Sequence, residues 1–276
     1  MQFLLKQKSI LPGFGLSLGI SVFCLSLLVV LPFAALITVT AGMGWSAFVN
    51  TIADERVLAA VFLSLRLSFY ATLTNVFFGT LVAWVLVRYE FPGKAIMNAL
   101  VDLPFALPTA VTGIALATLY SPKGWLGQFF SQKIAFSPAG IFLALVVVSL
   151  PFIVRAVQPV LEELQPELEE AAASLGANRW TTFRRVILPE LTPALLMGSG
   201  MMFARATGEY GSVIFIAGNI PMVSEILPVI ITAKLEMFDI QGASAVALFM
   251  LLIAFVILFI INATQWRISR RLEARA

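Results

Sequence analysis

The chain has 276 residues, of which 60% are hydrophobic and only 12% are charged, and its net charge is +3. An average soluble protein is about half apolar and about a quarter charged, so the composition excludes a soluble domain and predicts an integral membrane protein with several spans. The chain has no His, and its single Cys is Cys24, which excludes His-based catalytic triads, HExxH metal sites, disulfides and zinc clusters.

Six apolar stretches are long enough to cross a bilayer, whose hydrocarbon core takes about 20 residues of α-helix. They are Phe14–Val39, Val57–Val87, Ala95–Tyr120, Pro138–Val157, Pro193–Ile216 and Ala243–Thr264. The first is longer than the apolar core of a signal peptide, about 7–15 residues, so we expect an uncleaved helix. A shorter stretch, Ile220–Leu235, contains two prolines and is predicted to be an interfacial or half-inserted hairpin, with a seventh span as the alternative.

The distribution of Lys and Arg predicts the orientation, because cytoplasmic loops carry an excess of both. With both termini in the cytoplasm, 12 of the 18 basic residues lie inside. These are Lys6, Lys8, Arg88, Lys94, Arg155, Arg179, Arg184, Arg185, Arg267, Arg270, Arg271 and Arg275. We therefore expect an all-α, multi-pass protein of six transmembrane helices, forming a single domain over residues 1–276.

The longest charged stretch, residues 159–192, falls on the predicted cytoplasmic side between the fourth and fifth spans. Pro166 suits the first turn of a helix, and Gly176 suits its C-terminal stop. Asn178 is positioned to cap a second helix, Arg179–Leu188, which we expect Pro189 to end. The pattern predicts a rigid knob of two short helices that suits insertion into a groove on another protein, although a solvated hairpin without a partner would share its amphipathic character.

The same stretch resembles the EAA loop of bacterial ABC-importer permeases, whose pattern is EAA-x3-G-x9-I-x-L-P. The matching residues are Glu170, Ala171, Ala172, Gly176, Val186, Leu188 and Pro189, with Val186 in place of the usual Ile. The resemblance implies the fold of a binding-protein-dependent importer permease. It also implies that the loop docks onto a separate ATPase subunit and transmits nucleotide-driven closure to the membrane helices.

Further motifs resemble the branch of this family that carries oxyanions such as sulfate and molybdate. They are Arg88–Gly93 (RYEFPG), Asp102–Val111 (DLPFALPTAV), Gly208–Gly211 (GEYG) and Ile216–Asn219 (IAGN). Asp102–Val111 and Pro159–Leu164 are most similar to the CysT-like subunits of sulfate/thiosulfate permeases. The resemblance implies a pair of ATPase subunits, a second homologous permease forming a heterodimer, and a periplasmic sulfate-binding protein.

Charged residues within spans usually face protein or water, because a charge at the bilayer centre costs at least about 2.5–3.5 kcal/mol. Arg205 and Glu209 are four residues apart, so they share a helix face. Either Arg205 lies beside the transport path and offsets the charge of a passing dianion, or the two residues form a structural pair, which would neutralise that field. Asp102 would repel sulfate, so we expect it to pair with a cation or to tether a loop.

Neutral hydroxyls are the other candidate neighbours of an anion. Thr109 and Thr112 follow the two prolines that interrupt the third span. Ser64 and Ser68 belong to a polar stripe along the second span, which either lines a wet path or forms an interhelical packing seam. Together with Arg205 and Glu209, these four residues are the candidate substrate path.

The function expected from the sequence is that of a non-catalytic permease subunit of an ATP-driven importer for sulfate or thiosulfate. It would lie in a bacterial-type inner membrane in contact with lipid. No nucleotide-binding GxxxxGK[ST] or GxGxxG motif occurs, and no basic cluster indicates nucleic acid, so we expect no cofactor, metal or nucleic-acid partner. The alternatives are a molybdate or other oxyanion permease, and a secondary transporter driven by an ion gradient, for which Asp102 and Glu209 are the only titrating candidates.

Overall fold

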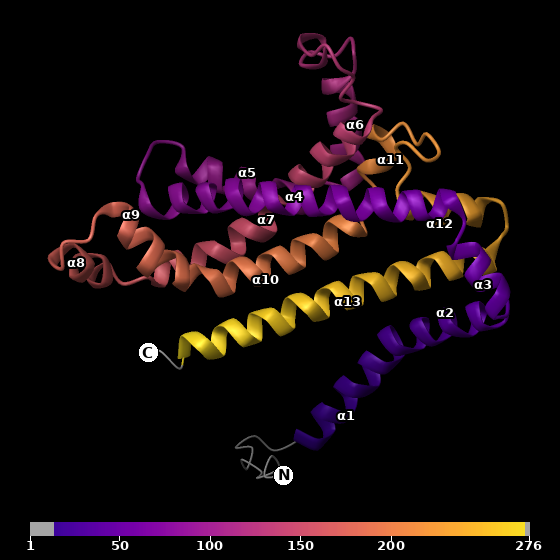
Figure 1. The fold of residues 1–276 in the computed structure, drawn as a ribbon, viewed down its shortest axis with the longest axis horizontal. Coiled ribbons are helices and arrows are strands. Elements are labelled where there is room, and N and C mark those ends of the chain that lie inside the picture. The colour runs from indigo at the N-terminus through magenta and orange to yellow at the C-terminus, as the bar shows by residue number, and fades with distance from the viewer. Residues whose placement is uncertain (1–13, 274–276) are drawn as a thin grey trace.

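A computed structural model of the chain describes residues 14–273, and all regular elements of that part are helices (Figure 1). In chain order they are α1 (Phe14–Leu25), α2 (Leu31–Ala41), α3 (Trp45–Ile52), α4 (Glu55–Arg88), α5 (Lys94–Ala106), α6 (Thr109–Tyr120), α7 (Pro138–Glu163), α8 (Pro166–Ser174), α9 (Arg179–Thr182), α10 (Leu188–Thr207), α11 (Val213–Ile216), α12 (Leu227–Glu236) and α13 (Ile240–Glu273). Short π-helical turns at Ser26–Val30 and Phe183–Ile187 join α1 to α2 and α9 to α10, and a 3₁₀ turn forms at Gly127–Phe129.

Five continuous helices of the described chain are long and apolar enough to cross a bilayer. They are Phe14–Ala41, Glu55–Arg88, Pro138–Glu163, Arg179–Thr207 and Ile240–Arg267. The predicted third span is the exception, because α5 and α6 meet at an angle of 110°. A count of six therefore holds only if this bent pair is taken as one span.

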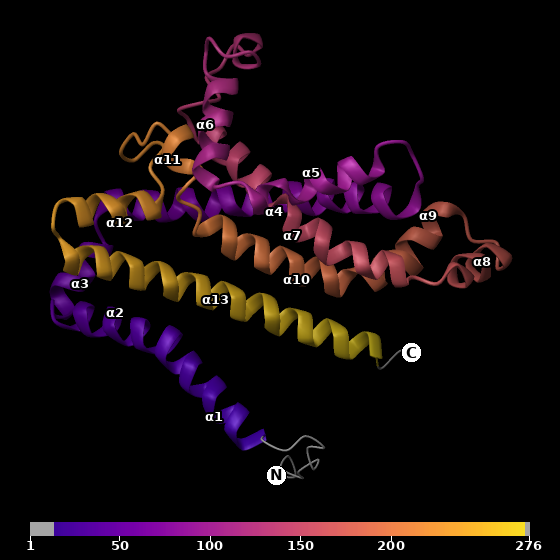
Figure 2. The same cartoon turned by 180° about the vertical axis from the view of Figure 1, so that it is seen from behind.

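The bend between α5 and α6 follows from two prolines four residues apart. Pro104 lies inside α5, and Pro108 has no N–H that could continue the helix by bonding to the Pro104 carbonyl. Leu107, which precedes Pro108, is extended, with φ −83° and ψ 138°. The predicted interruption of the third span by these prolines is therefore confirmed: Ala95–Tyr120 is divided into two helices, and α6 projects away from the bundle in both views (Figures 1 and 2).

The core lies where α7 packs between α4 and α10. The inward face of α7 is fully buried and aliphatic, with Ile141, Ile153, Val154 and Val157 all 0% exposed. At Gly79 of α4, an added Cβ would lie 2.9 Å from a side-chain methyl of Ile153, so glycine permits this close approach. α13 packs against α10, α12 and α2, while α1 has no buried residue and diverges from the bundle (Figure 2).

The predicted fifth span, Pro193–Ile216, is also interrupted in the structure. α10 ends at Thr207, and the separate short helix α11 begins at Val213. Between them, the Glu209 carboxylate accepts hydrogen bonds from the Ser212 backbone N–H and hydroxyl, both 2.9 Å, so a side chain replaces the helical bonding pattern. The expectation of one helix over this range was therefore wrong at its C-terminal end.

The apolar stretch Ile220–Leu235 forms turns followed by α12, whose ten residues are about 15 Å long. Such a helix is too short to cross the bilayer core of about 30 Å, so it is not a seventh span. Leu227 and Ile230 of α12 are buried against Val57 and Ala60 of α4 and Val246 of α13. The stretch is therefore a helix held against the bundle.

The short helices α8 and α9 lie at one end of the molecule, α13 runs toward that end, and α3 and α12 lie at the other end (Figures 1 and 2). Some of the basic residues behind the predicted orientation lie outside the residues whose side chains are described. They are Lys6, Lys8, Arg270, Arg271 and Arg275.

Candidate functional site

The helix α8 begins and ends as its sequence predicts. Pro166 occupies its first turn, and Gly176 has a φ of +81° just beyond its end. The N–H of Gly176 bonds to the carbonyl of Ala173 at 2.9 Å, and the N–H of Ala177 to that of Ala172 at 3.0 Å. This pair of bonds satisfies the last carbonyls of the helix and turns the chain sharply toward α9.

The second half of the loop is continuous with a membrane helix. The Asn178 side chain caps α9 by accepting the N–H of Thr181 at 2.8 Å. A π-helical turn, Phe183–Ile187, then leads directly into α10, and Pro189 lies in the first turn of α10. The expectation that Pro189 ends the helix was wrong, because a proline is tolerated in a first turn and the wider π turn precedes it.

The loop from Leu164 to Ile187 packs against the end of α4. Arg88, the last residue of α4, forms an ion pair with Glu169 of α8, and its guanidinium carbon lies 5.4 Å from the centre of the Trp84 ring. Phe183 meets Trp84 edge-on with ring centres 6.2 Å apart, and Trp180 stacks on Phe183 at 5.8 Å. These contacts hold the predicted knob in a defined position.

The knob extends beyond the ends of α4, α7 and α10 (Figure 1). Glu170, Ala171 and Gly176 are exposed on it, and Ala172 is half-buried. Leu175 is 89% exposed and Trp180 is 68% exposed, although both are large and apolar. The end of the pattern lies at the base of the knob, where Val186, Leu188 and Pro189 are half-buried.

Arg205 and Glu209 form the ion pair that their spacing allows. Glu209 is 1% exposed and is bonded to Ser212 as well as to Arg205. The Arg205 side chain is 36% exposed, so it reaches the surface of this chain. The pair joins the last turn of α10 to the segment just beyond it, and the two opposite charges neutralise one another locally.

Thr109 and Thr112 lie beside this break in α10. α6 packs against α11, and an added Cβ on Gly211 would lie 2.1 Å from the Thr109 hydroxyl oxygen. Gly113 approaches the backbone of Ser212 so closely that its own added Cβ would lie 2.3 Å from that carbonyl oxygen. The two interrupted helices therefore meet at their breaks, with Thr109 beside Gly211 and Gly113, the neighbour of Thr112, beside Ser212.

Ser64 and Ser68 lie in the packing seam of α4, and Ser64 lines a small cavity together with Thr207, the last residue of α10. Ser64 accepts a hydrogen bond from the Leu227 N–H at 3.0 Å, and Ser68 is 0% exposed. Asn75, further along the stripe, donates to the Val146 carbonyl of α7 at 2.8 Å. In this conformation the stripe packs helices together and does not line an open wall.

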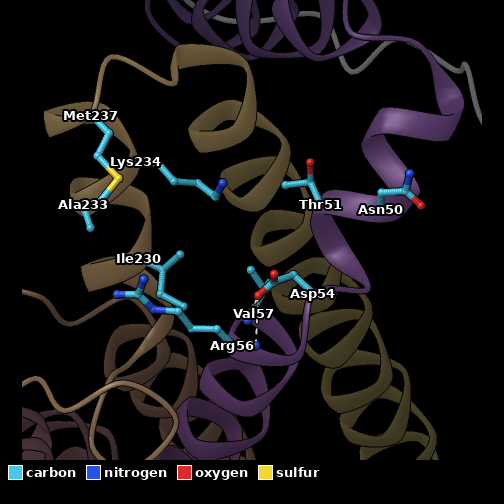
Figure 3. Close-up of a pocket in the computed structure, with 9 residues that line it drawn as sticks. All are labelled: Asn50, Thr51, Asp54, Arg56, Val57, Ile230, Ala233, Lys234 and Met237. Atoms are coloured by element: carbon cyan, nitrogen blue, oxygen red, sulfur yellow. Dashed lines mark hydrogen bonds between the residues drawn. The ribbon is translucent and has the colours of Figure 1, made fainter.

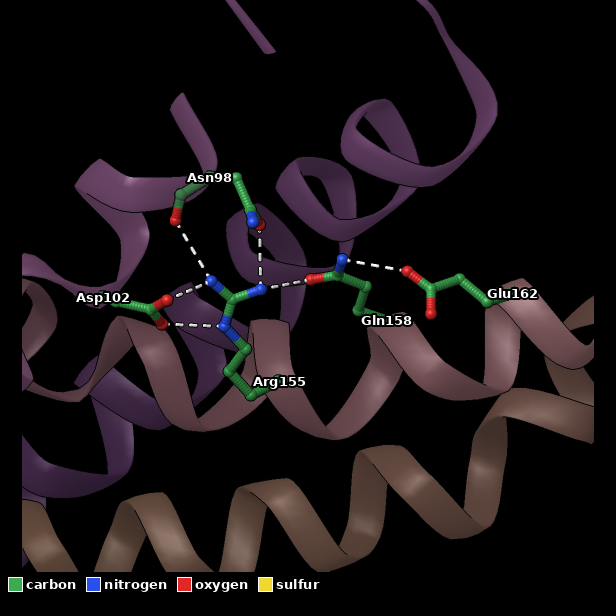
Figure 4. Close-up of polar contacts among 5 residues, drawn as sticks. All are labelled: Asn98, Asp102, Arg155, Gln158 and Glu162. Atoms are coloured by element: carbon green, nitrogen blue, oxygen red, sulfur yellow. Dashed lines mark hydrogen bonds and ion pairs between the residues drawn. The ribbon is translucent and has the colours of Figure 1, made fainter. Parts of the chain in front are cut away.

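Asp102 pairs with Arg155, a residue of α7 (Figure 4). The Arg155 Nε lies 2.7 Å and its Nη2 2.5 Å from the two Asp102 oxygens. Its remaining donors bond to the Asn98 side chain and carbonyl and to Gln158, so all five N–H groups are used. Arg155 therefore links α5 to α7 and has no donor left for an anion. Asp102 and Glu209, the two acids that a gradient-driven carrier would titrate, are both paired with arginine.

A cavity of about 370 Å³ opens at the opposite end of the molecule, between α3, α4 and α12 (Figure 3). Both of its cationic side chains are engaged with acids. Arg56 makes a two-pronged contact with the buried Glu225, at 2.6 and 2.7 Å, and Lys234 bonds to Asp239 at 2.9 Å. The cavity therefore presents no unpaired cluster of positive charge.

Several of these residues were not anticipated from the sequence. Trp84 and Arg88 are four residues apart on α4, a spacing that places them on one helix face and could have been noticed. The contacts of Arg88 with Glu169 and of Arg56 with Glu225 join residues 81 and 169 positions apart, so no local pattern indicates them.

Comparison with known proteins places these features in context. The family described as "Binding-protein-dependent transport system inner membrane component" matches residues 75–274. The chain is 46% identical over 269 residues to the "Sulfate transport system permease protein CysT" of Salmonella typhimurium, covering 96% of this chain and 97% of that one. It is 48% identical over 249 residues to the protein of the same name in Synechocystis, covering 89% and 87%.

Among solved structures, the chain is similar to a bacterial ABC transporter involved in the import of the acidic polysaccharide alginate. The TM-score is 0.76 at 17% identity, and the match covers 92% of this chain and 95% of that chain. This similarity confirms the predicted fold, a multi-pass helical permease of the ABC-importer type.

Proposed function

The chain belongs to the family of inner membrane components of binding-protein-dependent transport systems, and from this membership we propose that it is the permease subunit of an ATP-driven importer for sulfate and thiosulfate. The similarity to relatives named sulfate permeases supports this cargo, since it extends over 96% of the chain. A molybdate or other oxyanion permease is the competing assignment, and cargo competition separates the two.

The knob is the observation that carries the ATP-driven mechanism. It is a rigid pair of short helices beyond the membrane helices, with two large apolar side chains exposed on it, Leu175 and Trp180. Exposed apolar surface of this kind suits a protein groove. We assign Glu170–Pro189 as the segment that docks onto the ATPase subunit, with Glu170, Ala171 and Gly176 on the docking surface and Val186, Leu188 and Pro189 at its base.

The coupling has a direct structural route. Because α9, the π turn and α10 are continuous, a displacement of the docked knob pulls on α10 itself. The other end of α10 is the break at Gly208–Ser212, where Arg205 and Glu209 lie and where α6 meets it. We place the transport path along this break, with Thr109 and Thr112 as neutral donors.

The assembly that this mechanism needs contains two ATPase subunits, a binding protein and a second permease. Family membership implies the ATPase and the binding protein. We propose that the second permease is a homologue rather than a copy, and that both ends of the chain lie in the cytoplasm with the ATPase. The arginines described near the breaks are engaged by acids, which suits a path of weak contacts and leaves tight capture to the binding protein.

Reconstitution in liposomes tests the proposal. The chain is combined with its candidate ATPase, second permease and binding protein, and labelled sulfate uptake is measured with unlabelled thiosulfate or molybdate present. Competition by thiosulfate but not by molybdate is expected. Uptake of molybdate in preference to sulfate would keep the importer and replace its cargo, and failure of the ATPase to copurify with the chain would contradict the docking assignment.

A further inference from the structure

We propose that Arg88 is a positioning residue that connects the coupling knob to α4, so that α4 and α10 move together when the ATPase closes. This inference rests on the proposed function, because it concerns how motion of the docked knob reaches the membrane helices. None of the sequence motifs discussed above assigns a role to this residue's side chain.

The knob has covalent connections to α7 and α10 only. α7 leads into α8 through residues 164–165, and α9 continues into α10 through the π turn. α4 has no such connection, although its packing against α7 is the most extensive helix contact of the described chain. A movement of the knob therefore reaches the end of α4 only through side-chain contacts.

Those contacts converge on one turn of α4. Trp84 and Arg88 share a face, and Arg88 lies against the Trp84 ring at 5.4 Å. Arg88 holds α8 through Glu169, while Trp84 holds the π turn through Phe183 at 6.2 Å. Each half of the knob is thus held by one of two adjacent side chains on the same turn of α4.

The setting of the ion pair makes it stronger than an exposed pair. The Arg88 and Glu169 side chains are 23% and 33% exposed, so solvent screens them only partly. The neighbouring pair between Lys94 and Glu90 differs, because the Glu90 side chain is 87% exposed and the pair lies within four residues. Lys94 and Glu90 therefore offer a control at the same end of the molecule.

Arg88 also differs from the structural arginine of α7. Arg155 uses all five of its N–H groups, whereas the Nε of Arg88 is buried and has no hydrogen-bond partner. A buried donor without an acceptor is rare in native proteins and is unfavourable, so it is a feature that calls for an explanation. Arg88 is therefore not fully engaged by the contacts of this conformation, whereas every donor of Arg155 is used.

Paired measurements of ATP hydrolysis and sulfate uptake in the reconstituted complex test this role. R88E and E169R are each expected to lower uptake at least tenfold while the ATPase subunit remains bound and basal ATP hydrolysis stays within twofold of wild type. More ATP is then consumed per sulfate transported. The double variant R88E/E169R is expected to regain at least a third of the wild-type uptake, and K94Q is expected to behave as wild type.

A distance measurement follows the proposed motion without relying on transport. The single cysteine is removed by C24S, and spin labels are attached at Y89C and E167C, exposed positions at the end of α4 and in the first turn of α8, outside the docking segment. In the assembled complex, we expect the distance between the labels to stay the same with and without ATP in the otherwise wild-type chain. With R88Q added, ATP is expected to shift or broaden that distance.

Three results would overturn the proposal. Uptake by R88E within twofold of wild type would show that the ion pair transmits nothing. A double variant no better than either single variant would show that the two charges do not act as a pair. Loss of the ATPase subunit from purified R88E complexes would show that Arg88 serves docking, which would leave the proposed function intact.

Discussion

The replacement of Gly176 separates the folding of the knob from its docking. The φ of Gly176 is +81°, a left-handed conformation that costs an L-residue about 1–2 kcal/mol. An added Cβ meets no atom of this chain within 4 Å. G176A is therefore expected to pay only the conformational cost, and further side-chain size is expected to matter only where another protein lies against the knob.

The assay compares G176A and G176W in the reconstituted importer. G176A is expected to keep at least a third of the wild-type uptake, because a loss of about 1–2 kcal/mol leaves a typical domain folded. G176W is expected to lower uptake and ATPase copurification at least tenfold, equivalent to about 1.4 kcal/mol or more of docking free energy. The amount of permease in the membrane is expected to be the same for both.

Gly93 provides the matched control. It has a φ of +90°, it also has open space around its Cβ position, and it precedes α5 at the same end of the molecule. G93W should therefore carry the same conformational cost without losing the ATPase. If G176W and G93W behave alike, or if G176W retains uptake within twofold of G176A, the reasoning that places the ATPase against this glycine is refuted.

Three further predictions address the interrupted helices and the outer end. R205A leaves the buried Glu209 carboxylate without its cation. It is therefore expected to destabilise the fold by about 1–3 kcal/mol and to lower the yield of folded, monodisperse protein. Normal folding with a loss of uptake per molecule would instead indicate a pathway role for Arg205. G113A would bring its Cβ to 2.3 Å from the Ser212 carbonyl oxygen, so a loss of about 1–3 kcal/mol in thermal stability is expected, and an unchanged melting temperature would contradict the contact between the two breaks. The Lys234 ammonium and a backbone N–H hold the pKa of Asp239 below its usual value near 3.9, so the carboxylate's stabilisation is present above that pH and is lost as the pH falls through the lower folded pKa. The melting-temperature difference between wild type and D239N is expected to stay constant from about pH 7 to pH 5 and to shrink below about pH 4; a difference that shrinks already between pH 7 and 5 would contradict this pairing.

Local chemistry explains why much of the fold could be predicted. Membrane helices are long apolar runs, so the approximate limits of α4, α7 and α13 follow from hydropathy. The stop at Gly176 and the cap at Asn178 depend on neighbours within a few residues, and both were predicted correctly. These features need no knowledge of the tertiary structure.

The less accurate predictions concern prolines, a residue type that is compatible with more than one local structure. A proline either ends a helix or begins one, and Pro189 begins α10 because a π turn precedes it. Pro108 was expected to interrupt a helix, but the size of the bend depends on how α6 packs against α11. Hydropathy registers the apolar character of these segments but not their direction.

The pathway residues were the hardest to assign, because their roles depend on long-range contacts. The hydroxyls of Ser64 and Ser68 look the same in sequence whether they face water or another helix, and the structure buries both. The partner of Asp102 is 53 residues away, and that of Arg88 is 81 residues away. Spacing within one helix cannot reveal such pairs.

The dependence of sulfate flux on ATP distinguishes an ATP-driven importer from a gradient-driven carrier. Liposomes carrying the complete complex are loaded with either ATP or a non-hydrolysable analogue, ion gradients are collapsed with ionophores, and labelled sulfate uptake is followed in the presence of the binding protein. An ATP-driven importer is expected to take up sulfate with ATP alone and to take up none with the analogue. Sulfate uptake that proceeds without ATP hydrolysis and stops when the gradients collapse would contradict this expectation and would identify a gradient-driven carrier.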